Sequence, residues 1–337
     1  MKKFVLFVLV SSICACNAIS YAFEYKSVPT PKKLNDLVLS DYARTSYQSF
    51  LNNKIEESIR KEDKNLIYSP LSCFYINTID SFLNNHGDLT FLKEFVENTN
   101  IYVNDYFHFD CLPCVATTKE LGEDTIKSLN DNYVSVFTGN TNQLENSVSK
   151  LYGRRIKLNN RISNIISEIN ITASYYIPLT IVGKDTFEGA TQSNPTYVSG
   201  IASGRYKETT DYLIFEIPVN SIKMRILMPK GDKKTCDFDF NLLNQQELDC
   251  EEVGIEYLMP KFSINQSCVL VDDNCPYIYQ NNTFKFDEHG IKASSTSIKG
   301  PTSPSDYKEI TVKVNRPFIF TLNCYSVPLF YGEINSI

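Results

Sequence analysis

The sequence predicts an α+β fold with much antiparallel β-structure, and three observations lead to this prediction. Strand-like alternation with turn residues between the runs extends from Tyr197 to Phe262, with a turn expected at Gly204-Arg205-Tyr206. Apolar residues recur at helical spacing from Leu34 to Ile59. A third segment, Phe284 to Ser305, begins as a strand and becomes a run of small residues after Gly290.

The 337 residues, 42% of them hydrophobic, suffice for a large core. No Pro/Gly/Ser-rich linker divides the chain, so we expect one domain over residues 23–337. The formal charge of -6 argues against a nucleic acid or an anionic membrane as partner, because both require a basic face. We therefore expect a protein partner and a monomer.

Residues 1–22 are predicted to be a secretory signal peptide. Met1-Lys2-Lys3 precedes an apolar run from Phe4 to Ile13, and small residues follow it, with cleavage after Ala18 or Ala22. The alternative is a membrane anchor, but the run is shorter than the roughly 18 residues that a span requires. We therefore expect a secreted, extracellular protein.

Ten cysteines are present, and two of them, Cys14 and Cys16, lie in the signal peptide. The remaining eight permit disulfides in a secreted chain, with Cys236/Cys250 and Cys268/Cys275 as plausible pairs and the connectivity open. Cys111 and Cys114, with His108, resemble part of a zinc or redox site. No second Cys-x-x-Cys completes it, so a disulfide or burial is favoured, and we expect no metal and no cofactor. The cysteines that remain are Cys73, Cys111, Cys114, Cys236, Cys250, Cys268, Cys275 and Cys324.

Three Asn-x-Ser/Thr sequons, at Asn170, Asn265 and Asn281, are candidate glycosylation sites. Asn265 is favoured, because Asn281 lies at the start of the strand that leads to Gly290. Four basic residues after position 150 admit two interpretations, a polyanion site or a solvated helix face, of which the second is favoured. These residues are Arg154, Arg155, Lys157 and Arg161.

The segment from Phe284 onward has a strand-like first part and a second part made of small residues. Phe284 and Phe286 alternate with Lys285, so both are expected to face the core. After Gly290, small residues suit either an exposed loop or a strand between two others. These are Ala293, Ser294, Ser295, Thr296 and Ser297.

Two motifs in this region resemble those of the serpin family. The first is an acidic pair, then Gly and small residues: here Asp287, Glu288, Gly290 and residues 293–297. The second is Arg316-Pro317-Phe318 followed by Phe330-Tyr331-Gly332. The resemblance implies a compact, divergent serpin-like domain with a large central, mostly antiparallel sheet, two smaller sheets, flanking helices and an exposed reactive loop.

A further motif, Asn65 to Ser72, resembles the family's strand that turns into a central helix, and it implies that Ser69 and Ser72 lie beneath the sheet that opens. Helix capping by Ser69 is a compatible alternative. Thr125 to Leu158 is similar to the helix across the front of the sheet. The chain departs from the family at Tyr175, where an Asn is usual, and at Gln280, where a His is frequent. It also has no Trp, and little room for a helix between Phe262 and Phe284.

The resemblance implies that the chain is not an enzyme but a suicide substrate, with a reactive loop at about residues 290–310. A serine protease, or a cysteine protease, would attack the loop and become covalently bound as the loop enters the sheet. Family spacing places the scissile bond between Pro304 and Ser305, and a cut near Lys299, Ser303 or Tyr307 stays open. No catalytic motif suggests a hydrolase.

Alternation predicts which side chains of the inserted loop would face the core. Ile291, Ala293, Ser295 and Ser297 would point inward and fit. Lys299 would also point inward, where an unpaired ammonium costs several kcal/mol, and Pro301 and Pro304 each remove a ladder donor. These residues favour the alternative function, a non-inhibitory serpin-fold binding or carrier protein.

Overall fold

The structure, a computed structural model, describes residues 39–54, 57, 59–61, 63–84, 87–99, 107–158, 163–175, 178–219, 222–244, 250–272, 275–293, 309–324 and 327–337. The predicted signal peptide lies outside these residues. So do Ser294, Ser295, Thr296, Ser297, Pro304 and Ser305, and for these the predictions stand as predictions.

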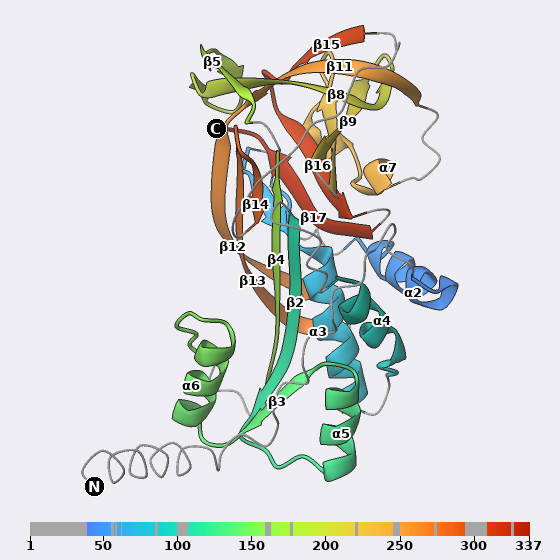
Figure 1. Cartoon of the computed structure of the whole chain (residues 1–337), viewed down its shortest axis with the longest axis vertical. Coiled ribbons are helices and arrows are strands. Elements are labelled where there is room, and N and C mark those ends of the chain that lie inside the picture. Colours follow the sequence, from blue (N-terminus) through green and yellow to red (C-terminus); the bar gives the residue numbers. More distant parts are fainter. Residues whose placement is uncertain are drawn as a thin grey trace, which may run out of the picture. The chain divides into compact units, whose positions relative to one another are not determined.

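Six α-helices occur in the described part of the chain (Figure 1). Ser40 begins the first of them, because its Oγ accepts a hydrogen bond from Ala43 N at 3.2 Å. Asn140 and Gln143 form a capping box at the start of α6. The helices are α2 (Asp41–Leu51), α3 (Pro70–Leu83), α4 (Thr90–Thr99), α5 (Glu123–Asp131), α6 (Thr141–Leu151) and α7 (Asn241–Asn244), with a 3₁₀ turn at Thr235–Asp237.

The largest sheet has nine strands in the order β1-β17-β16-β10-β9-β8-β11-β15, and β5 also pairs with β8. Its neighbours are antiparallel except β11 and β15. Every residue of β16 and β17 is buried. The strands are β1 (Leu66–Tyr68), β5 (Thr180–Lys184), β8 (Thr196–Glu208), β9 (Tyr212–Val219), β10 (Ile222–Pro229), β11 (Glu251–Pro260), β15 (Glu309–Lys313), β16 (Phe318–Cys324) and β17 (Val327–Ile334).

The second sheet has six strands in the order β12-β13-β14-β4-β2-β3, and β6 pairs with β7 in a third. A large, mostly antiparallel sheet with two smaller sheets and helices confirms the predicted α+β, serpin-like fold class. The strands are β2 (Phe107–Thr117), β3 (Ser135–Thr138), β4 (Ser163–Ser174), β6 (Phe187–Glu188), β7 (Gln192–Ser193), β12 (Phe262–Asp272), β13 (Cys275–Asp287) and β14 (Gly290–Ala293).

Two local predictions were wrong. Gly204-Arg205-Tyr206 was expected to be a turn but lies inside β8; a Cβ at Gly204 would come within 2.2 Å of Glu216 O, so this glycine permits a close approach of β9. The segment Thr125 to Leu158 was expected to be helical throughout, but β3 separates α5 from α6. The β-branched and aromatic side chains of β3 suit a short strand.

The described residues group into two compact units. One contains residues 75–97 and 111–168, and the other contains 31–74, 98–110 and 169–337. In the first, α6 packs on β2 through Leu144, Val148 and Tyr152, and the Tyr152 hydroxyl donates to Leu112 O at 2.8 Å. In the second, Phe262, Phe284 and Phe320 form an aromatic core. The candidate site lies wholly in the second unit.

Candidate functional site at the start of β14

A tight turn connects β13 to β14. Asp287 pairs with Gly290, so Glu288 and His289 form a two-residue loop. Gly290 has φ +135°, and a Cβ there would lie 2.3 Å from Ala173 O. Both the backbone conformation and the space therefore require glycine.

The residues after this turn form a strand that is paired on both sides. On β13, Ile291 pairs with Phe286 and Lys292 with Lys285. On β4, Gly290 to Ala293 pair in order with residues 174 to 171. The Ile291 side chain is fully buried, which confirms that it faces the core as the alternation predicted. Gly290 to Ala293 are thus already part of the six-stranded sheet.

Backbone hydrogen bonds hold the turn from the side of β4. Tyr175 N donates to His289 O at 2.9 Å, and Leu179 N donates to Glu288 O at 2.7 Å. The Tyr257 hydroxyl donates to the Tyr175 hydroxyl at 3.1 Å. Tyr175 therefore binds the turn through its backbone, so an Asn side chain is not required for this contact.

Two ion pairs fix the acidic residues of the turn. Lys261 lies 2.6 Å from Glu288, and its hydrogen bond holds the pKa of that carboxyl below the usual range. Lys285 pairs with Asp287. Burial opposes ionisation of Asp287, but the bonds from Lys285 and from His289 N outweigh it, so the pKa of Asp287 is lowered.

Acid is therefore expected to loosen the turn. Because both carboxyls have lowered pKa values in the folded protein, their stabilisation is complete above their unfolded pKa values of about 4. It is lost as the pH falls through the lower folded values. Hydrogen exchange of the amides of β14 between pH 6 and 3, corrected for intrinsic rates, should show falling protection. The Asp287→Asn, Glu288→Gln double variant should show little pH dependence, and an equal slope in both proteins would contradict the prediction.

Replacing Gly290 is expected to destabilise the protein or to release β14 from the sheet. Gly290→Ala should lower the free energy of unfolding by about 1 to 3 kcal/mol, the range for a residue held in an unfavourable backbone region, or release β14 from the sheet. Urea unfolding and proteolysis after residue 290 measure the two results. Gly183→Ala is the matched control, since Gly183 has φ +126° but nothing within 4 Å of its Cβ position. Equal effects of the two variants would show that contact with Ala173 is unimportant.

The two serines of the Asn65 to Ser72 motif are both buried and are joined by a hydrogen bond. Ser69 is 2% exposed and Ser72 is 6% exposed. Ser69 Oγ donates to Leu329 O at 2.8 Å and accepts from Ser72 N at 3.2 Å. Ser69 therefore caps α3, as the helix-capping interpretation predicted, and it also binds β17; the role in a sheet that opens stays a prediction.

Three side-chain amides, from Gln266, Gln280 and Asn282, cover the edge of β1 that β17 leaves open; we call them the amide clamp. Gln266 Oε1 accepts from Ile67 N at 2.9 Å, and Asn282 Nδ2 donates to Ile67 O at 2.8 Å. Gln280 accepts from Ser69 N at 3.0 Å and donates to Ser69 O at 2.8 Å. The amide clamp thus takes the place of a neighbouring strand.

The hydrogen bonds of Gln280 give a physical reason for an amide at a position where the family frequently has a His. A primary amide offers a donor and an acceptor on adjacent atoms, so it binds both backbone groups of Ser69 at once. A neutral imidazole has its donor and acceptor on opposite sides of the ring. The contact of Gln280 also carries no titratable group, so its strength does not depend on protonation of this side chain.

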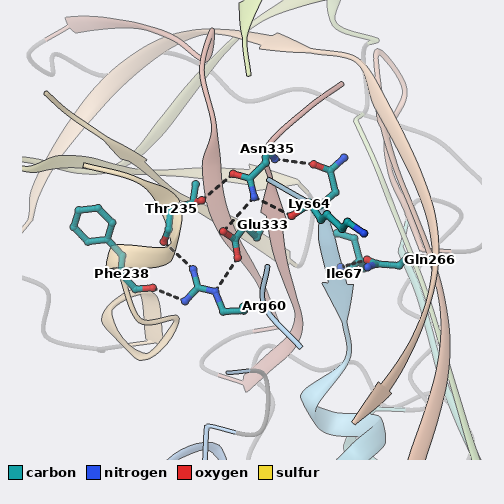
Figure 2. A network of polar contacts seen from close by, with 9 residues as sticks. Arg60, Lys64, Ile67, Thr235, Phe238, Gln266, Glu333 and Asn335 are labelled. Atoms are coloured by element: carbon teal, nitrogen blue, oxygen red, sulfur yellow. Dashed lines mark hydrogen bonds and ion pairs between the residues drawn. The ribbon is translucent and has the colours of Figure 1, made fainter. Parts of the chain in front are cut away.

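Sequence reasoning missed a buried ionic network near β1 (Figure 2). Arg60 Nε lies 2.8 Å from Glu333 Oε2, and its other nitrogens donate to Thr235 O and Phe238 O, each at 2.7 Å. Asn335 extends the network by donating to Lys64 O at 2.9 Å. Arg60 and Glu333 are 273 positions apart, so no local pattern connects them.

The candidate glycosylation sites differ in exposure. Asn265 on β12 and Asn281 on β13 are exposed, whereas Asn170 is half-buried on β4 and the hydroxyl residue of its sequon, Thr172, is fully buried.

In the basic cluster after position 150, Arg154 pairs with Glu168 at 2.6 Å. Arg154, Arg155 and Lys157 follow the end of α6, so the interpretation of a helix face was wrong.

The cysteines correct another expectation. Cys250 and Cys268 carry free thiols, so neither Cys236/Cys250 nor Cys268/Cys275 is a disulfide in the structure. Cys114 is also a free thiol, and burial raises its pKa to about 12. Within the described residues, no group of three or more His, Cys, Asp or Glu side chains is placed to hold a metal ion. None of the described helices is long and apolar enough to cross a membrane.

Comparison with known proteins gives one consistent result. No protein-family model matches the sequence, and neither does any curated protein. Solved structures do match. The thermophilic serpin tengpin in its native state has a TM-score of 0.68 at 12% identity, covering 91% of this chain and 97% of its own.

Two further matches have a TM-score of 0.65 and cover 88% of this chain. Serpin48, a highly specific serpin of the insect Tenebrio molitor, is 14% identical and is covered over 97% of its length. Human thyroxine-binding globulin in complex with its ligand is 12% identical and is covered over 98%. The neighbours thus include a serpin described as highly specific and a thyroxine-binding globulin, and what they share with this chain is the architecture. The chain has the serpin fold.

Proposed function

We propose that the protein is a secreted inhibitor of a serine protease and presents residues 290–310 as a substrate-like loop. One observation carries the proposal: Gly290 to Ala293 lie as a strand between β13 and β4. The segment directly before the predicted scissile bond therefore begins in the sheet that it would have to enter. Insertion of the cleaved loop would extend a strand that already exists.

The register of β14 indicates where further loop residues would lie. Lys285 pairs with Lys292, and antiparallel continuation would place Ser295 beside Asn282 and Ser297 beside Gln280. Asn282 and Gln280 are each 6% exposed and belong to the amide clamp. Serine hydroxyls would therefore meet buried amides with which they can form hydrogen bonds.

The same register bears on the scissile bond. If the inserted loop kept this register, residue 302 would lie opposite Cys275, the first residue of β13. Loop residues up to 302 would therefore pair along the whole length of β13. A cut between Pro304 and Ser305 would leave enough chain to fill it, and so would a cut near Ser303 or Tyr307. A cut after Lys299 would leave the last positions empty. The length of β13 thus agrees with a cut at Pro304-Ser305, near Ser303 or near Tyr307, and argues against a cut after Lys299.

One feature favours the second candidate function, a non-inhibitory binding or carrier protein. Continuation of the register would place Lys299 beside Ile278, which is 2% exposed. Burying an unpaired ammonium there costs several kcal/mol. Insertion past this position would be slowed, and a slow loop would allow the protease to hydrolyse the acyl-enzyme and escape.

The test is incubation of the secreted protein with a panel of serine and cysteine proteases, followed by denaturing gels and sequencing of the new N-terminus. An SDS-stable complex supports inhibition and locates the scissile bond. Cleavage without a complex, and without a gain in melting temperature, supports the carrier function. Turnover of a substrate by the protein itself would contradict both.

A matched pair of variants tests the inserted register. Ser295→Arg would place a charge beside Asn282, whereas Thr296→Arg would place the same charge on the outward face. We expect the covalent complex to be lost in the first variant and retained in the second. Loss of the complex in both would contradict the register but not the inhibition.

Lys292→Glu is expected to stabilise β14. Lys292 lies directly opposite Lys285 on the same face of the sheet, and like charges in this position are destabilising. Reversing one charge should raise protection of the amides of β14 in hydrogen exchange, by about 0.2 to 1 kcal/mol. Lys292→Gln serves as the neutral control and should have a smaller effect; no change in either variant would show that the two charges are screened.

A further inference from the structure

Strand β12 lies at one end of the six-stranded sheet, beside β13 (Figure 1). In the described part of the chain it pairs with β13 alone, over Phe262 to Asp272. The backbone groups along its other side therefore form a sheet edge. Such an edge can pair with a strand of another molecule, and natural proteins usually protect it with Lys, Pro, a bulge or a short strand.

The sequence of β12 contains few of these protections. Residues 263–271 include no charged residue and no proline, and the irregularity in pairing comes only after Leu270. Ser263, Asn265 and Ser267 are exposed, and Val269 is 45% exposed. An uncharged, proline-free segment of this length at an edge is the kind that aggregates.

A glycosylation sequon occupies the middle of this strand. Asn265 and Ser267 point outward, while Gln266 between them points inward to bind Ile67 in the amide clamp. The register places Asn265 opposite Thr283 and Ser267 opposite Asn281, so the second sequon lies on the same exposed face of β13. The acceptor amide of Asn265 thus projects from a strand at the end of its sheet.

We propose that Asn265 carries an N-linked glycan that shields the edge of β12 from pairing with other chains. In the reaction, Nδ2 of Asn265 attacks the anomeric carbon of a lipid pyrophosphate-linked oligosaccharide. A C–N bond forms, the C–O bond to the pyrophosphate breaks with its electron pair, and the amide loses one proton. The proposal requires passage through the secretory pathway but does not depend on protease inhibition.

Occupancy is tested on the protein secreted from eukaryotic cells. Peptide N-glycosidase in ¹⁸O-water converts a glycosylated asparagine to labelled aspartate, which peptide mass spectrometry locates. We expect the label at Asn265. Secreted protein with unmodified Asn265 overturns the proposal.

The shielding is tested with variants of the same secreted protein. Asn265→Gln and Ser267→Ala each remove the sequon, and both should raise the oligomeric fraction several-fold in light scattering while the urea midpoint stays near that of the parent. Asn265→Lys also lacks the glycan but supplies an edge charge, so it should remain monodisperse. Asn281→Gln is the control on the interior strand β13 and should behave like the parent. If the Asn265→Gln variant remains monodisperse in light scattering, the proposal that the glycan shields the edge of β12 is wrong.

Discussion

Arg60→Met should lower the free energy of unfolding by about 3 to 5 kcal/mol, the range for removing one partner of a buried ion pair. The Glu333 side chain is 1% exposed, so the variant would leave its carboxylate buried without the guanidinium, and Thr235 O and Phe238 O would each lose one hydrogen bond. Urea unfolding followed by circular dichroism gives the value.

Two further variants show whether the loss of stability in Arg60→Met comes from the unpaired carboxylate of Glu333. Arg154→Met breaks the pair with Glu168, in which the arginine side chain is 54% exposed, and should cost less than about 1 kcal/mol. The double variant Arg60→Met, Glu333→Leu removes both charges and should recover much of the stability. If the double variant is as unstable as the single one, the loss comes from packing and not from the unpaired carboxylate.

Gln280→Leu should destabilise the protein by about 1 to 3 kcal/mol, because Ser69 N would be buried without its acceptor and Ser69 O would keep only the hydrogen bond from Cys73 N at 3.3 Å. The urea midpoint gives the magnitude, and hydrogen exchange at Ser69 locates the effect. Gln266→Leu removes only the acceptor of Ile67 N and should cost less. Equal losses in the two variants would argue against the two-point contact.

Much of the fold was predictable because local patterns carry it. The alternation in β8 to β11, the change to small residues after Gly290 and the two motifs at β16 and β17 are all visible in the sequence. The Phe-x-Gly motif also has a local reason: a Cβ at Gly332 would come within 2.1 Å of the Phe320 ring, so this position admits only glycine.

The contacts that hold β1 were not predictable in the same way. Ser69 and Ser72 were identified by a motif, but Gln266 and Asn282 were not, because they lie 199 and 215 positions from Ile67. Single polar residues on strands carry no signal that distinguishes a buried hydrogen-bonded amide from an exposed one. The prediction of a turn at Gly204 was wrong for a related reason, since glycine suits both a turn and a close approach of strands.

The pairing of β1 with β17 constrains when the protein can fold during synthesis. Leu66 pairs with Glu333 and Tyr68 with Tyr331, so β1 must wait for more than three quarters of the chain to be translated before its neighbour exists. Until then its polar edges can be satisfied only by water, by the amide clamp or by a chaperone. By contrast, β12 and β13 are adjacent in sequence and can form a hairpin as soon as they leave the ribosome. The nascent chain can therefore form the β12–β13 hairpin before β17 has been translated, whereas the nine-stranded sheet is completed only near the end of translation.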